Sequence, residues 1–294
     1  MEYLFMNLAA FEAFVKVMET GSISLAAEQL FITQPAVTKR IHSLEDYFGV
    51  KLFESAGRGI QATHAAHSLL PKVKNWLNEL GDIHHTLSHE QGQVKGKLKI
   101  GTSHHIGLHH LPQHLKHYVQ HHPNVTLDVH FVDSEQAHEH VLAGDLELAF
   151  LTLPPQLDPR LHYIPLWNDP LVFVASSFHP LASMKNLTLA DLMQYPSLLP
   201  ATQTYTAQIT MAEFEKEGLK PKVSMSNNPL ESIRMLVSIG VGWSVLPKTL
   251  VNQDVVQLDL AVEMKRQLGM VWHPARTQSK PAKALVELMT ATII

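Results

Sequence analysis

The N-terminal part of the chain contains three short amphipathic segments separated by two tight breaks, and this order constrains the fold more than any other feature. Residues 8–19 repeat apolar side chains at spacings of three and four, which predicts a helix with one buried face. Gly21 ends this pattern, and a second short helix is expected over 24–30. After a three-residue break, the segment 34–47 carries a proline in its first turn, where the missing N–H costs little. Two small-residue helices joined by a tight turn predict a helix-turn-helix.

The residues that follow predict a wing and a long helix. Residues 49–63 form a short, glycine-containing segment that is typical of a two-stranded wing. Apolar residues at helical spacing then continue over 64–89, a helix of about 25 residues and about 37 Å. Because this helix is too long for so small a neighbour, we expect its apolar stripe to contact a second copy of the chain. We place a DNA-binding domain at 1–63, a linker helix at 64–90 and a polar hinge at 91–97.

The C-terminal part alternates predicted strands and helices. Strands are expected at 97–102, 125–131, 146–152, 170–175, 197–200, 222–226, 242–246 and 269–273, and helices at 106–121, 134–143, 188–193, 206–217, 229–239 and 280–291. This alternation implies parallel sheets with crossover helices. Two such runs predict two lobes around a cleft, with lobe I at about 98–167 and 273–294 and lobe II at about 168–272. Ligands of such sheets bind beyond the carboxyl ends of the strands.

Composition limits the function without identifying it. The net charge is −4, and the first 62 residues hold five Lys or Arg against seven Asp or Glu, so overall charge does not indicate DNA binding. The absence of cysteine excludes a disulfide framework, thiolate catalysis and cysteine-based metal sites. No apolar run reaches the ~20 residues of a membrane span, and the N-terminus does not read as a signal peptide. We therefore expect a cytoplasmic protein that does not contact a membrane.

An ordered set of residues in the N-terminal part resembles the LysR-type transcriptional regulators. The set comprises Phe14, Val17, Glu19-Thr20-Gly21-Ser22-Ile23, Ala26-Ala27, Leu30, Thr33-Gln34-Pro35-Ala36-Val37-Thr38, Ile41, Leu44-Glu45, Phe48-Gly49-Val50 and Leu52-Phe53. The sequence departs from this family at Ser55, Ala62 and Ala66, where the family often has Arg, Leu and Gly.

The resemblance covers essentially the whole chain. It implies an N-terminal all-α winged helix-turn-helix with a long linker helix, and a C-terminal α/β two-lobed effector domain like a periplasmic binding protein. It also implies a homodimer through the linker helix, commonly assembled as a dimer of dimers, on a partly palindromic double-stranded promoter site. RNA polymerase is a further possible partner.

The third helix supplies the residues expected to read DNA. Its outward positions are Thr33, Gln34, Pro35, Thr38, Lys39 and His42. The Gln34 amide suits adenine, and Thr38 suits a thymine methyl group or a phosphate. Lys39, Arg40 and Arg58 are expected at phosphates, where they position the domain without reading sequence. The alternative is that Thr33 and Gln34 only cap the helix.

Hydroxyl-rich turns mark the expected effector site. Thr102, Ser103, His104 and His105 stand where a strand runs into a helix, and Thr152 ends a neighbouring strand. Thr202, Gln203 and Thr204 precede a helix of the second lobe, and Asn228 precedes another. Helix N-termini and hydroxyls favour anions, so we expect a small carboxylate or other oxyanion with Ser103 facing Thr202 across the cleft. The alternative is ordinary helix capping by the same hydroxyls.

Four histidines on one predicted helix raise the question of a metal site. His110, His114, His117 and His121 recur on the helix predicted over 106–121, but no carboxylate accompanies them, so we assign no metal site and no cofactor. No nucleophile motif or phosphate-binding glycine loop is present, which argues against an enzyme. The alternatives to a regulator are a cytoplasmic small-molecule-binding protein and a passive DNA-binding protein.

Overall fold

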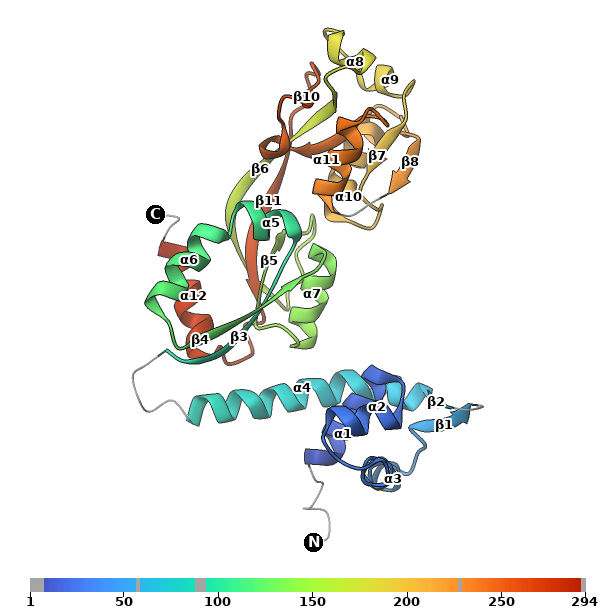
Figure 1. Ribbon diagram of the computed structural model, residues 1–294, viewed down its shortest axis with the longest axis vertical. Helices are drawn as coiled ribbons and strands as arrows, with labels where there is room; N and C mark the ends of the chain where they lie inside the picture. Colours follow the sequence, from blue (N-terminus) through green and yellow to red (C-terminus); the bar gives the residue numbers. More distant parts are fainter. Residues whose placement is uncertain (1–7, 57–58, 88–93, 227–228, 292–294) are drawn as a thin grey trace. The chain divides into compact units, whose positions relative to one another are not determined.

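The computed structural model describes residues 8–56, 59–87, 94–226 and 229–291 (Figure 1). The chain divides into two compact units, residues 1–84 and residues 85–294, and each is considered by itself.

The first unit is a winged helix-turn-helix, as predicted. Helices α1 (Leu8–Thr20), α2 (Ile23–Gln29) and α3 (Gln34–Phe48) pack around one apolar core, and β1 (Phe53–Ala56) pairs antiparallel with β2 (Gly59–Ala62). The Ser22 hydroxyl caps α2 by accepting the Leu25 N–H. Gly49 ends α3 at φ 65°, a left-handed conformation that glycine adopts without strain.

The long helix α4 (His64–Leu87) follows the wing and contributes to this core. Ala66 and Val73 are buried there, with Leu69, Leu70 and Leu77 packed against the same cluster. The expectation that the apolar stripe of α4 contacts a second copy of the chain was therefore wrong for the N-terminal half of this helix. Trp76 remains 39% exposed on this helix, although its ring lies 5.1 Å from that of Phe11.

The second unit is built on a seven-stranded mixed sheet. Its strands are β3 (Gly96–Thr102), β4 (Val125–Phe131), β5 (Leu148–Thr152), β6 (His162–Ser176), β9 (Ser244–Pro247), β10 (Val255–Gln257) and β11 (Met264–Trp272). Only β4, β3 and β5 run parallel, whereas β6 and β11 are antiparallel to their neighbours. A smaller parallel pair joins β7 (Ser197–Leu199) to β8 (Val223–Ser226). The expectation of parallel sheets was wrong for the rest of this sheet, because β11 returns between β5 and β6 and runs antiparallel to both.

Strands β6 and β11 belong to both lobes. On β6, Trp167 packs in the core of the first lobe and Leu171 in that of the second. On β11 the change falls between Met264 and Leu268. The second half of β11, placed in lobe II by the sequence, therefore packs in lobe I. These two strands connect the lobes (Figure 1).

The helices cover the two lobes and place their N-termini. In the first lobe they are α5 (His104–His109), α6 (Pro112–His121), α7 (Ser134–Ala143) and α12 (Lys280–Ala291), and in the second α8 (Pro180–Ser183), α9 (Leu189–Leu192), α10 (Tyr205–Lys216), α11 (Leu230–Ser238) and a 3-10 turn at Lys248–Leu250. The single helix expected over 106–121 is two helices, because Pro112 has no N–H to donate to the preceding turn and instead occupies the first turn of a new helix. The four histidines therefore do not share one helix face.

Candidate functional site

The outward face of α3 carries most of the residues predicted to read DNA. Gln34, Pro35, Thr38, Lys39 and His42 line one open hollow on the surface. The opposite face of the helix is buried in the core of the unit. The hollow shows that these side chains are presented together, as a helix in a DNA groove requires.

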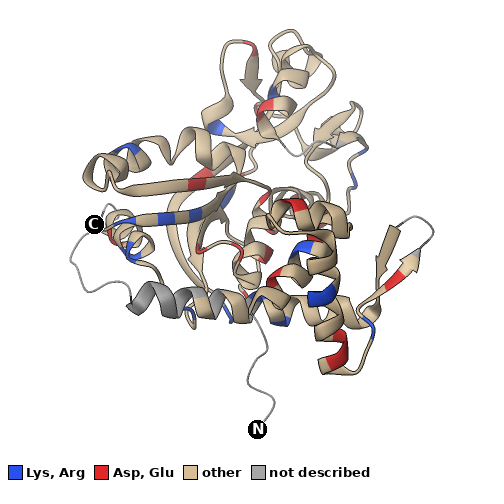
Figure 2. Ribbon diagram, turned by 60° about the horizontal axis from the view of Figure 1, so that its bottom comes forward, with Lys and Arg blue, Asp and Glu red and all other residues tan. Residues whose placement is uncertain are grey.

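The other predicted DNA residues differ from one another. Thr33 occupies the N-cap position of α3, but its side chain makes no capping hydrogen bond, so capping does not account for it. The Arg40 guanidinium donates to the Ala9 carbonyl at 3.5 Å, towards α1. Arg58 lies outside the described residues. Basic and acidic residues are interspersed in this unit (Figure 2). Lys39 is exposed and lies on the outward face of α3.

Glu45, which the sequence did not single out as a functional residue, joins α3 to the wing. Its side chain is nearly buried, and one carboxylate oxygen accepts the backbone N–H groups of Leu52 at 2.9 Å and Phe53 at 3.2 Å. The other oxygen accepts from Lys51 Nζ at 2.7 Å. Burial raises the pKa of Glu45, but the hydrogen bonds from Lys51 and the two N–H groups outweigh burial and lower this pKa overall. The carboxylate thus sets where the wing begins relative to the reading helix.

We expect Glu45→Gln to loosen the wing. Hydrogen bonds to a charged group contribute about 1.5–3 kcal/mol, and the amide loses this charge while facing Lys51. Because the folded-state pKa is lowered, the contribution of Glu45 is present at neutral pH and is lost as the pH falls through that pKa. Hydrogen exchange of the amides at 52–62 measures the change. The exposed Glu54→Gln is the matched control, and equal exchange in the two variants would contradict the role of Glu45.

In the second unit, residues from both lobes line a partly open cavity of about 50 Å³. Residues at the starts of four helices line it: Ser103, His104 and His105 from α5, Asp133, Ser134 and Glu135 from α7, Thr204 and Thr206 from α10, and Pro229 and Leu230 from α11. Thr152, Pro200 and Arg266 complete the lining. The N-cap side chains of α5, α7 and α11 make no capping hydrogen bond. In α7 and α11 the carboxylates of Glu135 and Glu231 instead accept their own backbone N–H groups, so of these three helices α5 is the one whose first turn has no side-chain acceptor among the described residues.

The cavity contains some of the residues predicted for the effector and lacks others. Ser103, His104, His105, Thr152 and Thr204 line it. The Thr204 hydroxyl, however, accepts the Ala207 N–H and donates to the Ala201 carbonyl, so it caps α10. The remaining predicted residues do not line the cavity, since Thr102 is buried, Thr202 and Gln203 are exposed, and Asn228 lies outside the described residues. The structure therefore places Thr204 and Thr206, rather than Thr202, opposite Ser103.

Sequence reasoning missed the buried ion pair beside the cavity. Arg266 of β11 and Asp169 of β6 are cross-strand partners, exposed by only 4% and 1%. Two guanidinium nitrogens lie 2.7 Å from Asp169 Oδ2, and a third donates to the Thr206 hydroxyl at 2.8 Å. Burial raises the pKa of Asp169, but His105 and Arg266 outweigh burial and lower it overall. A basic residue 97 positions from its partner leaves no local sequence signal.

Glu135 connects the lobes across the cavity. Its Oε1 accepts the backbone N–H of Tyr205, at the start of α10, at 2.6 Å. Burial raises the pKa of this carboxyl group. A carboxylate of the protein itself therefore already occupies one of the helix N-termini at the cavity.

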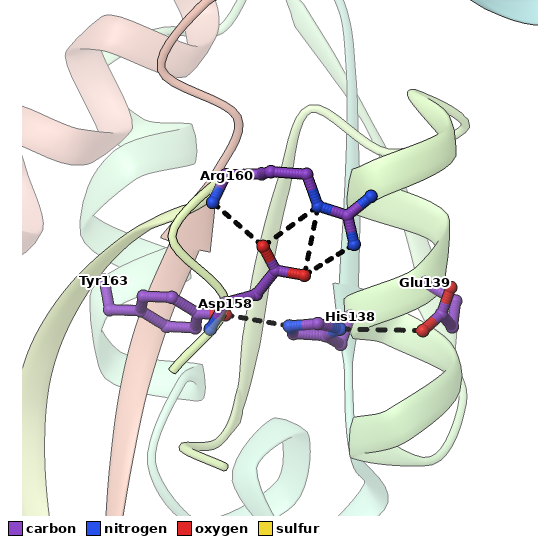
Figure 3. A network of polar contacts seen from close by, with 5 residues as sticks. All are labelled: His138, Glu139, Asp158, Arg160 and Tyr163. Carbon is purple, nitrogen blue, oxygen red and sulfur yellow. Dashed lines mark hydrogen bonds and ion pairs between the residues drawn. The ribbon is translucent and has the colours of Figure 1, made fainter. Parts of the chain in front are cut away.

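A separate network braces the loop between β5 and β6 (Figure 3). His138 Nε2 lies 2.8 Å from the Tyr163 hydroxyl, which accepts the Asp158 N–H at 3.2 Å, and Arg160 pairs with Asp158 at 2.6 Å. Burial lowers the pKa of His138, which favours the neutral ring. These contacts hold the loop beside α7, and we assign them a structural role.

The described residues include no helix that is both long and apolar enough to cross a membrane.

A helix-turn-helix with an exposed reading face, and a two-lobed α/β domain with a polar cavity between its lobes, define a ligand-responsive DNA-binding regulator. Residues 8–67 match the family described as bacterial regulatory helix-turn-helix protein, lysR family, and residues 91–293 match the LysR substrate binding domain. The chain belongs to the LysR family of transcriptional regulators.

One relative agrees with this assignment, and two solved structures share the fold. The HTH-type transcriptional activator CmpR of Synechocystis sp. is 32% identical over 242 residues, which cover 82% of this chain and 78% of that protein. The crystal structure of CbnR, a LysR family transcriptional regulator, has a TM-score of 0.70 at 19% identity and covers 98% of this chain and 99% of its own. The effector binding domain of QuiR in complex with shikimate has a TM-score of 0.62 at 19% identity, covering 68% of this chain and 97% of its own.

Proposed function

We propose that the cavity between the lobes binds a small anionic effector, a carboxylate or other oxyanion, and that its occupancy controls transcription from a promoter bound by α3. The observation that carries this proposal is the convergence of four helix N-termini on one cavity, three of them without a hydrogen bond to the N-cap side chain. Uncapped N–H groups and the positive ends of helix dipoles favour an anion. The Ser103 hydroxyl, which makes no capping hydrogen bond, and the Arg266 guanidinium add further donors.

The size of the cavity limits the effector in this closed arrangement. A cavity of about 50 Å³ holds roughly three to five water molecules at about 10–15 Å³ each. A larger effector requires the lobes to separate along β6 and β11. An effector that binds the open and closed arrangements unequally shifts the population between them, and this supplies the control of transcription.

A thermal-shift screen of the full-length chain tests the class of effector. Small carboxylates and phosphates are compared with their neutral amides and with amines of similar size. Anions alone are expected to raise the melting temperature, because a ligand that binds only the folded state stabilises it. Stabilisation by neutral or cationic compounds alone would refute the proposal.

We expect Glu135→Gln to bind the anion about tenfold more tightly. Two like charges about 10 Å apart repel by roughly 1.7 kcal/mol at an effective dielectric constant near 20, and 1.4 kcal/mol is a factor of ten. Since burial raises the pKa of Glu135, acidification removes this charge first, so anion affinity in the native protein rises as the pH falls. The variant loses that part of the pH dependence. Calorimetric titration of an anion from the screen measures both effects.

The matched control is Glu139→Gln. Glu139 lies on the same helix, is 77% exposed and does not line the cavity. The affinity of the Glu139→Gln variant for the anion should therefore equal that of the native protein. Equal affinities in the Glu135 variant and the native protein would count against an anion in this cavity.

Three finer points belong to the same proposal. We propose a homodimer through α4, supported by the exposed Trp76, and further assembly into a dimer of dimers as the resemblance implies. We place the regulator in the cytoplasm, with promoter DNA and RNA polymerase as partners. We also propose that it binds its effector without turnover, which recovery of unchanged effector after incubation would support.

A further inference from the structure

Helices α5 and α11 bring together three potential metal ligands, of which His105 also lines the effector cavity. His105 and His109 lie one turn apart on α5, and Glu231 lies in the first turn of α11. His105 Nδ1 is 3.8 Å and His109 Nε2 is 3.5 Å from Glu231 Oε1. One ligand atom from each residue lies within 4.8 Å of both others.

Two buried polar groups of this cluster have only long contacts with their neighbours. His105 is 3% exposed, and its ring nitrogens lie 3.5 Å from Asp169 Oδ2 and 3.8 Å from Glu231 Oε1 without making a hydrogen bond among the described residues. The buried Glu231 Oε1 also makes no hydrogen bond among the described residues. Unsatisfied buried polar groups are costly, so a ligand that satisfies several of them at once is favoured.

The spacing of these atoms suits a tetrahedral ion. Zinc bonds of about 2.0–2.1 Å to nitrogen or oxygen place two tetrahedral ligand atoms about 3.3 Å apart. The separations of His105 Nδ1 and His109 Nε2 from Glu231 Oε1, 3.8 and 3.5 Å, lie close to this value, and the two imidazole ligand atoms lie within 4.8 Å of each other. Two histidines and one carboxylate are an established zinc ligand set.

A neighbouring group of His105, His110 and Asp169 fits a cation less well. Asp169 Oδ2 already accepts a hydrogen bond from Arg266 Nε at 2.7 Å and lies 2.7 Å from a second nitrogen of the same guanidinium, whose positive charge repels a metal ion. The His110 ring also packs 5.0 Å from Trp167.

We propose that His105, His109 and Glu231 bind one divalent transition-metal ion, with Zn²⁺ the best match. The ion joins α5 of the first lobe to α11 of the second. Three protein ligands leave the fourth position to water. Because His105 also lines the effector cavity, the ion lies next to the effector site and restricts separation of the lobes.

The test titrates the full-length chain with Zn²⁺ alone against a chromogenic chelator, without effector or DNA. The variants are His109→Ala and Glu231→Gln, whose side chains are 36% and 28% exposed, so both are expected to fold. The matched control is His117→Ala with His121→Ala, an exposed i,i+4 pair on α6 with stacked rings 4.0 Å apart. This control matters because the chain has 20 histidines, which bind Zn²⁺ weakly.

One tightly bound ion per chain is expected in the native protein and in the control. Each site variant should bind Zn²⁺ more than about 100-fold more weakly than the native protein. Mutation of a residue that only hydrogen-bonds to a metal ligand typically costs about 10–100-fold in metal affinity, so loss of a ligand itself should cost more. Visible absorption of bound Co²⁺ should disappear in the same variants. The proposal is overturned if the native chain has no tight ion, if either site variant retains it, or if the α6 control loses it. None of these outcomes bears on the anion proposal, because no effector is present.

Discussion

Asp169→Asn is expected to lower the melting temperature of the effector-binding unit by roughly 6–20 °C. Removing one partner of a buried ion pair costs about 3–5 kcal/mol, because the remaining charge stays buried without compensation. In a unit of this size, 1 kcal/mol corresponds to a shift of about 2–4 °C. Arg266 is the residue left unpaired, next to the cavity and on one of the two strands that join the lobes. The substitution should therefore weaken effector binding as well as stability.

The pH dependence checks the same interaction independently. The folded-state pKa of Asp169 lies below its ordinary value of 3.8, so the pair contributes fully at neutral pH and is lost as the pH falls through the lowered pKa. The melting temperatures of native and variant proteins should thus converge in acid. Asp158→Asn is the control, because Asp158 pairs with Arg160, whose side chain is 67% exposed, and such pairs contribute little. A shift in Asp169→Asn no larger than in this control would show that the buried pair is not stabilising.

Gln34→Ala is expected to reduce discrimination between the cognate promoter site and unrelated duplex by about 5- to 150-fold. A bidentate amide contact to adenine is worth about 1–3 kcal/mol of discrimination. Gln34 is exposed at the start of α3, within the hollow it shares with Thr38 and Lys39. Fluorescence anisotropy at fixed salt, with DNA from the region beside the regulator's own gene and a scrambled duplex, measures both affinities.

Lys39→Ala provides the contrasting result. A lysine at a phosphate contributes equally to all DNA sequences, so the affinities for both duplexes should fall together. The slope of the logarithm of affinity against the logarithm of salt concentration should decrease by about one phosphate contact. If Gln34→Ala instead lowers the affinity for both duplexes equally, Gln34 does not contact the bases.

Much of the fold followed from local patterns. The helices over 134–143 and 280–291 and the strand over 125–131 have the bounds that the sequence predicted, and α3 differs by one residue at its end. Each of these elements has a regular apolar period, and two end at a glycine in the left-handed conformation, Gly49 and Gly144. Such signals lie within a few residues of the element they define.

Strands β6 and β11 show where local patterns fail. The sequence predicted only 170–175 and 269–273 of them, because their side chains pack in two different lobes along one strand and show no single alternation. Their antiparallel pairing joins positions about 100 residues apart, which no local pattern reports.

The site residues divide in the same way. The outward face of α3 and the position of Ser103 at the start of α5 follow from the sequence itself, since a helix start and its outward positions are local properties. Only the tertiary structure brings Asp169 to Arg266, Glu135 to Tyr205, and Glu231 to His105. Each of these pairs joins segments distant in the chain, and a charged residue in a sequence does not reveal which partner its burial will require.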